Sequence, residues 1–212
     1  MNKISNKIKV MNKQRLLEDM QRGLTDSVRY FSDESRHDRE SWIIYSFLEN
    51  IGVQFVDEEI TTPLSDPPDV TFRDSRFEIK EILDPGRRRH LEFKEQLKKA
   101  VTTKDPDDLV SAYDFVYDLS PLDILQLIEK DMERLINKYA PAVTARLDLL
   151  FYINLMHHTI RPDKMPDAQS LTKFGWRSVS ALFGWAGLVY YASDTAPDFL
   201  QEKCGQLIRK KF

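Results

Sequence analysis

Residues 67–82 read PPDVTFRDSRFEIKEI, and the predicted fold depends on the pattern in this stretch. Side chains along a β-strand alternate between the two faces of a sheet. Phe77 and Ile79 therefore share one face, which is apolar, and Glu78 and Lys80 share the other. The stretch predicts a strand that carries two opposite charges on the face that its apolar residues do not occupy.

The same stretch predicts that two carboxylates meet. Asp69 follows a proline pair at the start of one short strand, and a turn at residues 73–75 leads into the next strand. If the strands pair as a hairpin, Asp69 and Glu78 lie opposite one another. Carboxylates only a few ångströms apart repel each other unless one is protonated or a cation lies between them. Such hard oxygen ligands suit Mg²⁺ or Mn²⁺.

Lys80 would lie beside this candidate metal site. A lysine ammonium can orient or help to deprotonate a water, or stabilise charge that develops on a phosphate. A metal ion polarises a phosphoryl oxygen and makes its water more acidic, so these groups together suit phosphodiester hydrolysis. The alternative is that Asp69, Glu78 and Lys80 line the solvent face of a hairpin, where alternating charges are ordinary.

Residues 36–51 form the clearest predicted helix, and Gly52 ends it. Glu40 lies four residues before Ile44, so it extends the core-facing stripe toward the helix N-terminus. A carboxylate on that stripe is costly to bury without a partner, which favours a role for Glu40 in the site. The alternative is that the helix dipole alone favours an acid in the first turns.

The order of elements predicts an α/β fold in which helices cover the faces of a mixed β-sheet. No repeat and no low-complexity linker interrupts it. The expected strands are residues 53–60, 68–72, 76–83, 147–154 and 186–193. The expected helices are residues 14–31, 36–51, 87–100, 121–139 with Ser120 as the N-cap, 166–185 as one or two helices, and 197–212.

Length and composition indicate one globular domain with an N-terminal appendage. The chain has 212 residues, enough for one sizeable core, and 42% of them are hydrophobic. Residues 1–15 are basic and contain no acid, so we expect a mobile or partly helical arm before a single α/β domain over residues 16–212. Alternatively, the native core begins at Met11 and the earlier residues are peripheral.

Several classes of protein are disfavoured. No apolar run is long enough to cross a bilayer, and the N-terminal residues lack the apolar segment of a secretory signal. The lone Cys204 allows no internal disulfide and no zinc site built on two cysteines, and it fits a cytoplasmic protein. The net charge of -3 means that nucleic acid would have to contact local basic patches.

One such patch opens the predicted helix at residues 87–100. Cations at a helix N-terminus oppose the helix dipole, and a nucleic-acid phosphate would offset that cost. The alternative is a solvated face, or salt bridges to nearby acids such as Asp84 and Glu92. The residues of this basic run are Arg87, Arg88, Arg89 and His90.

Other motifs carry less chemistry. His157 and His158 follow a predicted strand, and adjacent strand residues point to opposite faces, so the pair rarely chelates one ion. A loop or partner-contact role is expected for them. The chain has no Walker A loop, GxGxxG, GxSxG or HExxH, so nucleotide-triphosphate, dinucleotide, α/β-hydrolase and zincin functions lack support.

Pro68-Asp69 followed by Glu78-Ile79-Lys80 resembles the PD-(D/E)xK motif of restriction-endonuclease-like nucleases. That family has an αβββαβ core, and the expected order of a helix, three strands, a helix and a strand is similar to it. The wider sequence, including DPPDVTF and FEIKEILDPGRRRH, resembles an uncharacterised bacterial family described as putative endonucleases. The wider resemblance covers most of the chain after residue 11.

This resemblance implies an endonuclease that uses Mg²⁺ or Mn²⁺ to hydrolyse phosphodiester bonds of nucleic acid, with DNA favoured. It implies metal binding by Asp69, Glu78 and the backbone carbonyl of Ile79, contact of Lys80 with the attacking water, and assistance from Glu40. Such proteins often dimerise, which leaves a homodimer open, although no heptad here argues for one. The alternative is a non-catalytic nucleic-acid or protein interaction module with an idle site on the same fold.

Overall fold

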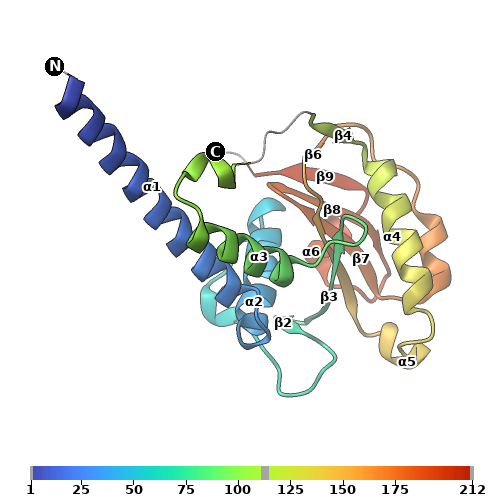
Figure 1. The fold of residues 1–212 in the computed structure, drawn as a ribbon. Coiled ribbons are helices and arrows are strands. Elements are labelled where there is room, and N and C mark those ends of the chain that lie inside the picture. The colour runs from blue at the N-terminus through green and yellow to red at the C-terminus, as the bar shows by residue number, and fades with distance from the viewer. Residues whose placement is uncertain (1, 111–114, 211–212) are drawn as a thin grey trace. The chain divides into compact units, whose positions relative to one another are not determined.

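The computed structural model describes the backbone of residues 2–110 and 115–210, with side chains from residue 12 onward (Figure 1). The chain divides into two compact units. Unit 1 is formed by Met1–Arg36 and Pro85–Asp114, and unit 2 by His37–Asp84 and Phe115–Phe212. The expected arm over residues 1–15 and single domain over residues 16–212 stay predictions. Among the described residues, no helix combines the length and apolar character needed to cross a bilayer.

Unit 1 is built from two long helices, α1 (Asn2–Tyr30) and α3 (Arg89–Thr102). Two short 3₁₀ helices, η1 (Asp33–Ser35) and η3 (Pro106–Leu109), follow them. Residues 2–15 of the expected basic arm are helical and form the first part of α1, which runs on to Tyr30. The side chains of Lys3, Lys7 and Lys9 lie outside the described residues.

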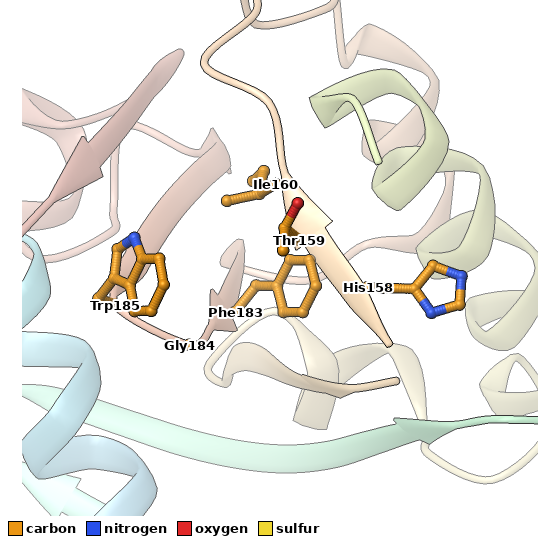
Figure 2. A pocket seen from close by; sticks show the side chains of 6 residues that line it. All are labelled: His158, Thr159, Ile160, Phe183, Gly184 and Trp185. Atoms are coloured by element: carbon orange, nitrogen blue, oxygen red, sulfur yellow. The ribbon is translucent and has the colours of Figure 1, made fainter. Parts of the chain in front are cut away.

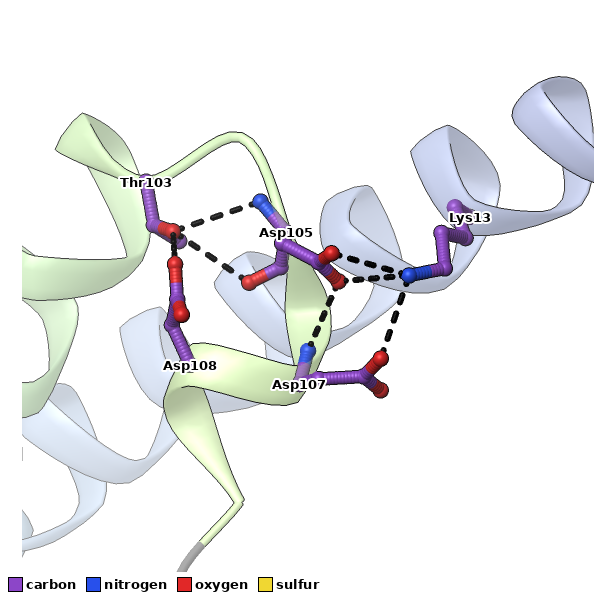
Figure 3. Close-up of polar contacts among 5 residues, drawn as sticks. All are labelled: Lys13, Thr103, Asp105, Asp107 and Asp108. Atoms are coloured by element: carbon purple, nitrogen blue, oxygen red, sulfur yellow. Dashed lines mark hydrogen bonds and ion pairs between the residues drawn. The ribbon is translucent and has the colours of Figure 1, made fainter.

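A polar network ties α1 to η3 within unit 1 (Figure 3). The Lys13 ammonium lies 2.8 Å from an Asp105 carboxylate oxygen and 3.1 Å from Asp107. This ammonium lowers the pKa of the Asp105 carboxyl, which also caps η3 by accepting a hydrogen bond from the Asp107 backbone N–H. Apolar packing reinforces the unit, because the Phe31 and Phe93 rings stack with centroids 5.0 Å apart.

Unit 2 contains a seven-stranded mixed sheet flanked by helices, and the predicted fold class is confirmed. Its strands are β1 (Ile60–Thr61), β2 (Val70–Phe72), β3 (Ser75–Leu83), β5 (Asp148–Asn154), β7 (Ser178–Phe183), β8 (Ala186–Ala192) and β9 (Gln206–Arg209). They lie in the order β1-β2-β3-β5-β7-β8-β9. The central strands β3, β5 and β7 are parallel, and the outer pairs are antiparallel. A separate two-stranded sheet pairs β4 (Tyr117–Leu119) with β6 (His158–Ile160).

Helices cover both faces of the seven-stranded sheet. On one face, Phe47 of α2 (Arg36–Asn50) packs in one core with Phe77 and Leu150. On the other face, Ile128 of α4 (Pro121–Leu135) packs in a second core with Phe151. The elements α2, β1, β2, β3, α4 and β5 follow one another in the expected αβββαβ order, but α3, β4 and α5 are inserted between β3 and β5. The remaining short helices of unit 2 are η2 (Asp57–Glu59), α5 (Pro141–Thr144), η4 (Gln169–Phe174) and α6 (Asp198–Glu202).

The expected cap of α4 is present. Ser120 and Asp123 form a capping box, with Pro121 in the first turn. The Ser120 hydroxyl lies 2.6 Å from the Asp123 carboxylate, and the Ser120 backbone N–H donates to the same oxygen over 2.7 Å. These hydrogen bonds lower the pKa of the Asp123 carboxyl.

Replacing Ser120 with alanine is expected to lower the free energy of unfolding by about 1 kcal/mol at pH 7. The folded-state pKa of Asp123 lies below its unfolded value, so the stability that this carboxylate adds is fully present above the unfolded pKa. It is lost as the pH falls through the lowered folded pKa. The difference between wild type and Ser120→Ala in the free energy of unfolding, measured with urea, should therefore become smaller as the pH falls from roughly 5 to 2. An unchanged difference across that window would contradict the capping role of the carboxylate.

The expected strand over residues 53–60 is mostly wrong. Only Ile60 and Thr61 pair with β2, and residues 57–59 form η2 instead. The Glu59 carboxylate accepts a hydrogen bond from the Val56 backbone N–H over 3.0 Å and pairs with the Arg73 guanidinium at 2.7 Å. Local side-chain bonds of this kind compete with strand pairing and favour a turn.

The expected helices over residues 166–185 and 197–212 are also largely wrong. Residues 178–183 form β7, which is buried along its whole length between β5 and β8. A strand buried on both faces shows no polar alternation, so its apolar spacing cannot be told from that of a buried helix. In the C-terminal segment, α6 ends early, and Gly205 takes a positive φ of 74° before the chain enters β9.

A buried ion pair fastens the N-terminal ends of β5 and β7. The Asp148 side chain is fully buried, and the Arg177 guanidinium contacts both of its carboxylate oxygens. The Ser178 hydroxyl donates to Asp148 over 2.8 Å, and the Arg76 backbone N–H donates over 3.0 Å. Arg177 also donates to the carbonyl of Asp74 in the β2–β3 turn over 3.1 Å. The network therefore fixes the hairpin against the parallel strands.

Candidate metal centre

The strands β2 and β3 form the predicted hairpin. Val70 pairs with Phe77, and a tight turn that begins at Arg73 joins the strands. The backbone N–H of Asp69 donates to the Phe77 carbonyl over 2.9 Å, which continues the pairing beyond β2. Asp69 thereby lies beside Glu78, as the hairpin register predicts.

Three carboxylates gather at this end of the hairpin. Asp66, Asp69 and Glu78 each offer a carboxylate oxygen, and these oxygens lie within 4.8 Å of one another. Asp69 and Glu78 are buried, and Asp66 is exposed. One oxygen of Asp69 accepts a hydrogen bond from the Ile79 backbone N–H over 2.8 Å, so the strand itself orients this carboxylate.

The two oxygens of Glu78 have different surroundings. Oε1 accepts hydrogen bonds from the Tyr139 hydroxyl and from the Lys80 ammonium. Oε2 is buried, and no hydrogen-bond donor reaches it from the residues that the structure describes. The side chain of Glu78 is only 2% exposed, so an ionised oxygen without a donor at this depth is costly unless a cation approaches it.

Lys80 lies where the sequence predicts, on the same face of β3 as Glu78. Its ammonium donates to the Ile79 carbonyl over 2.9 Å as well as to Glu78. The same ammonium lies 5.8 Å from the centroid of the Tyr139 ring. The carbonyl of Ile79, which the resemblance implies as a metal ligand, thus already accepts a bond from Lys80.

Tyr139 is a site residue that the sequence analysis missed. Burial and the hydrogen bond to Glu78 raise the pKa of the Tyr139 hydroxyl, so it stays a proton donor at neutral pH. Its ring meets that of Trp176 edge to face, with centroids 5.4 Å apart. Tyr139 follows α4 and lies far from the motif along the chain, so no local pattern could point to it. Asp66 was also missed, although it stands three residues before Asp69 in the quoted DPPD.

The chemistry of these residues fits a divalent cation. Three carboxylates bring three formal negative charges close together, and a divalent cation such as Mg²⁺ or Mn²⁺ would offset their mutual repulsion. The donors are hard oxygens, as these ions prefer. The Glu78 oxygen without a donor is the specific feature that such an ion would satisfy.

Glu40 is buried on α2, 8% exposed, so the core-facing position that the helical period predicts is confirmed. Its carboxylate lies 3.5 Å from the Nδ1 atom of His37. Glu40 does not belong to the group of described residues whose oxygens lie within 4.8 Å of one another. Its expected assistance in the site stays a prediction.

The basic run belongs to unit 1 and is partly engaged there. Arg87 pairs with Glu92 at 2.8 Å, which is one of the salt bridges considered from the sequence. The Arg89 guanidinium lies 4.1 Å from the centroid of the Phe31 ring, and His90 Nδ1 lies 2.9 Å from the Phe31 carbonyl. Arg88 is exposed. Phosphate contact by this run stays a prediction.

The two histidines lie around the start of β6. His157 takes a positive φ of 58°, and His158 Nδ1 lies 2.6 Å from the Met156 carbonyl. Figure 2 shows His158 at one side of a small open pocket and Trp185 at the other, with Phe183 and Thr159 between them. The lining is mostly apolar and offers no set of metal ligands.

The fold and the carboxylate–lysine hairpin define a mixed α/β protein with a candidate metal centre at the edge of its parallel strands. Residues 12–211 match the family described as "Putative endonuclease, protein of unknown function (DUF1780)", and the chain belongs to that family. No curated protein matches the chain.

A solved structure from Pseudomonas aeruginosa strain PAO1 has a similar fold. It is described as a protein of unknown function of the monooxygenase superfamily. The two chains superpose with a TM-score of 0.64 at 22% identity, over 93% of this chain and 96% of that one. At this identity the likeness shows the fold alone.

Proposed function

We propose that this protein is a divalent-metal-dependent endonuclease of the PD-(D/E)xK type that hydrolyses phosphodiester bonds of nucleic acid, with DNA as the favoured substrate. Membership of the family described as "Putative endonuclease, protein of unknown function" supports the general activity. The observation that carries the metal dependence is the buried Oε2 of Glu78, which has no donor among the described residues and lies in a cluster of three carboxylates.

In this proposal Asp69 and Glu78 hold Mg²⁺ or Mn²⁺. When bound, such an ion supplies Lewis-acid polarisation of a phosphoryl oxygen and makes a nearby water more acidic. The backbone N–H of Ile79 fixes Asp69, and the Tyr139 hydroxyl fixes Glu78, so both carboxylates are oriented before substrate arrives.

Lys80 supplies the positive charge of the proposed site. Its side chain is 18% exposed, so the ammonium is anchored at Glu78 and the Ile79 carbonyl but remains open to solvent. From this position it would orient the attacking water and stabilise the charge that develops on the phosphate. Glu40 and the exposed Arg88 are proposed as supporting groups, the first at the site and the second on phosphate.

Hydrolysis of plasmid DNA, single-stranded DNA and RNA is expected only with Mg²⁺ or Mn²⁺, and chelation should stop it. Asp69→Asn keeps an oxygen that can accept the Ile79 hydrogen bond but removes the charge. It should therefore raise the Mn²⁺ concentration needed for half-maximal rate by roughly 10–100-fold. Quantitative gel assays across a Mn²⁺ titration measure this.

Glu58→Gln is a matched control, because it removes an exposed carboxylate outside the cluster and should leave the titration unchanged. A folded wild-type protein that binds nucleic acid but cleaves none of the three substrates with either ion would favour the alternative, a non-catalytic interaction module. The expected homodimer and cytoplasmic location stay predictions.

A further inference from the structure

The expected PD-(D/E)xK pattern assigns two carboxylates and a backbone carbonyl to the ion, and the structure brings a third carboxylate to the same place. Asp66 lies outside the pattern, three residues before Asp69. Its carboxylate offers an oxygen within 4.8 Å of oxygens from both Asp69 and Glu78. A cation between the two buried acids would therefore also lie close to Asp66.

The backbone carbonyl of Ile79 is the weaker candidate for the third ligand. It accepts a hydrogen bond from the Lys80 ammonium over 2.9 Å, so an ion would share this oxygen with a positive charge. Asp66 instead brings a full negative charge and is exposed to solvent.

The hydrogen-bond donors around Glu78 also indicate that the ion needs a third protein ligand. Tyr139 and Lys80 both bond Oε1, and Oε2 is left buried without a donor from the described residues. Glu78 is thereby arranged to give the ion one oxygen rather than two. Mg²⁺ and Mn²⁺ favour octahedral oxygen coordination, so further protein oxygens or waters are needed, and Asp66 can supply one.

We propose that Asp66 is a third carboxylate ligand of the divalent ion, a role that rests on the metal site of the proposed function. The DPPD segment would then supply two ligands, Asp66 and Asp69, and Asp66 would bind the ion from the solvent-exposed side. The class of ligand is a hard divalent cation of the size of Mg²⁺ or Mn²⁺.

Isothermal titration with Mn²⁺ alone, without nucleic acid, tests this on the full chain. Asp66→Asn is expected to raise the Mn²⁺ dissociation constant at least about tenfold, and Asp69→Asn by about as much or more. Asp66→Glu keeps a carboxylate on a longer side chain and should stay within a few-fold of wild type. Glu58→Gln, the matched exposed control, should not change the constant.

The outcomes separate this inference from the proposed function. If Asp66→Asn binds Mn²⁺ as wild type does while Asp69→Asn is impaired, Asp66 is not a ligand and the proposed function stands. If wild type binds no Mn²⁺, or Asp69→Asn binds equally well, the proposed metal site itself is overturned. Thermal unfolding of each variant without metal shows that it is folded, and Asp66→Ser, which also removes the carboxylate and should weaken Mn²⁺ binding to a similar extent, retains the test should Asp66→Asn fail to fold.

Discussion

Lys80→Met is expected to lower the rate of DNA hydrolysis by roughly 10²–10⁴-fold while Mn²⁺ still binds. The substitution removes the ammonium that would orient water and stabilise charge on the phosphate, but it removes none of the carboxylates of the cluster. Because the variant lacks a positive charge beside the carboxylates, it should bind Mn²⁺ as tightly as wild type or more tightly. Single-turnover cleavage at saturating Mn²⁺ measures the rate, and calorimetry measures the binding.

Lys130→Met is the matched control for this variant. Lys130 is an exposed lysine of α4, and its replacement should change neither quantity. A Lys80→Met protein that cleaves within about threefold of wild type would contradict a role for Lys80 in general acid–base or electrostatic catalysis, for which far larger losses are typical. A variant that loses Mn²⁺ binding as well would instead give Lys80 a structural role in the site.

Asp148→Asn is expected to have the largest effect on stability, a loss of about 3–5 kcal/mol in the free energy of unfolding. The substitution leaves the Arg177 guanidinium, only 12% exposed, without its counter-charge. Both oxygens of Asp148 accept hydrogen bonds. In the variant, the amide NH₂ group would replace one of these oxygens and would face a hydrogen-bond donor, which leaves both groups unsatisfied. Urea unfolding measures the loss, and the melting temperature should fall by roughly 6–20 °C.

Asp131→Asn provides the comparison with an exposed ion pair. Asp131 lies 3.1 Å from Arg134 on α4, where the arginine side chain is 69% exposed. Pairs of this kind contribute about 0–1 kcal/mol, so this variant should unfold much like wild type. A loss below about 1 kcal/mol for Asp148→Asn would show that the buried network relaxes or admits water, contrary to the large penalty for breaking a buried pair.

The hairpin of the candidate site was predictable because its signals are local. The period of two places Glu78 and Lys80 on one face of β3, and the short turn sets the register that brings Asp69 beside Glu78. The helical period likewise predicts the buried position of Glu40. Each of these predictions needed only residues a few positions apart.

The remaining features depend on tertiary structure. Tyr139 reaches Glu78 from the chain after α4. The apolar run of β7 pairs with β5 at one edge and with β8 at the other, and the spacing of apolar residues within the run does not show these partners. Asp66 had a local signal, the repeated acid in DPPD, but the motif by itself assigns a role only to Asp69. Sequence therefore predicted the pair of acids and the lysine, and not the residues that surround them.

The edge-to-face contact between Tyr139 and Trp176 gives the candidate site an optical reporter. Trp42 and Trp185 are 49% and 53% exposed, whereas Trp176 is 4% exposed, so its fluorescence should lie at shorter wavelength than theirs. Because Tyr139 contacts this indole and also donates a hydrogen bond to Glu78, we expect a change at the carboxylate to alter the emission of Trp176. Titration of the protein with Mg²⁺ should therefore shift or change the Trp176 emission if the proposed site binds the ion.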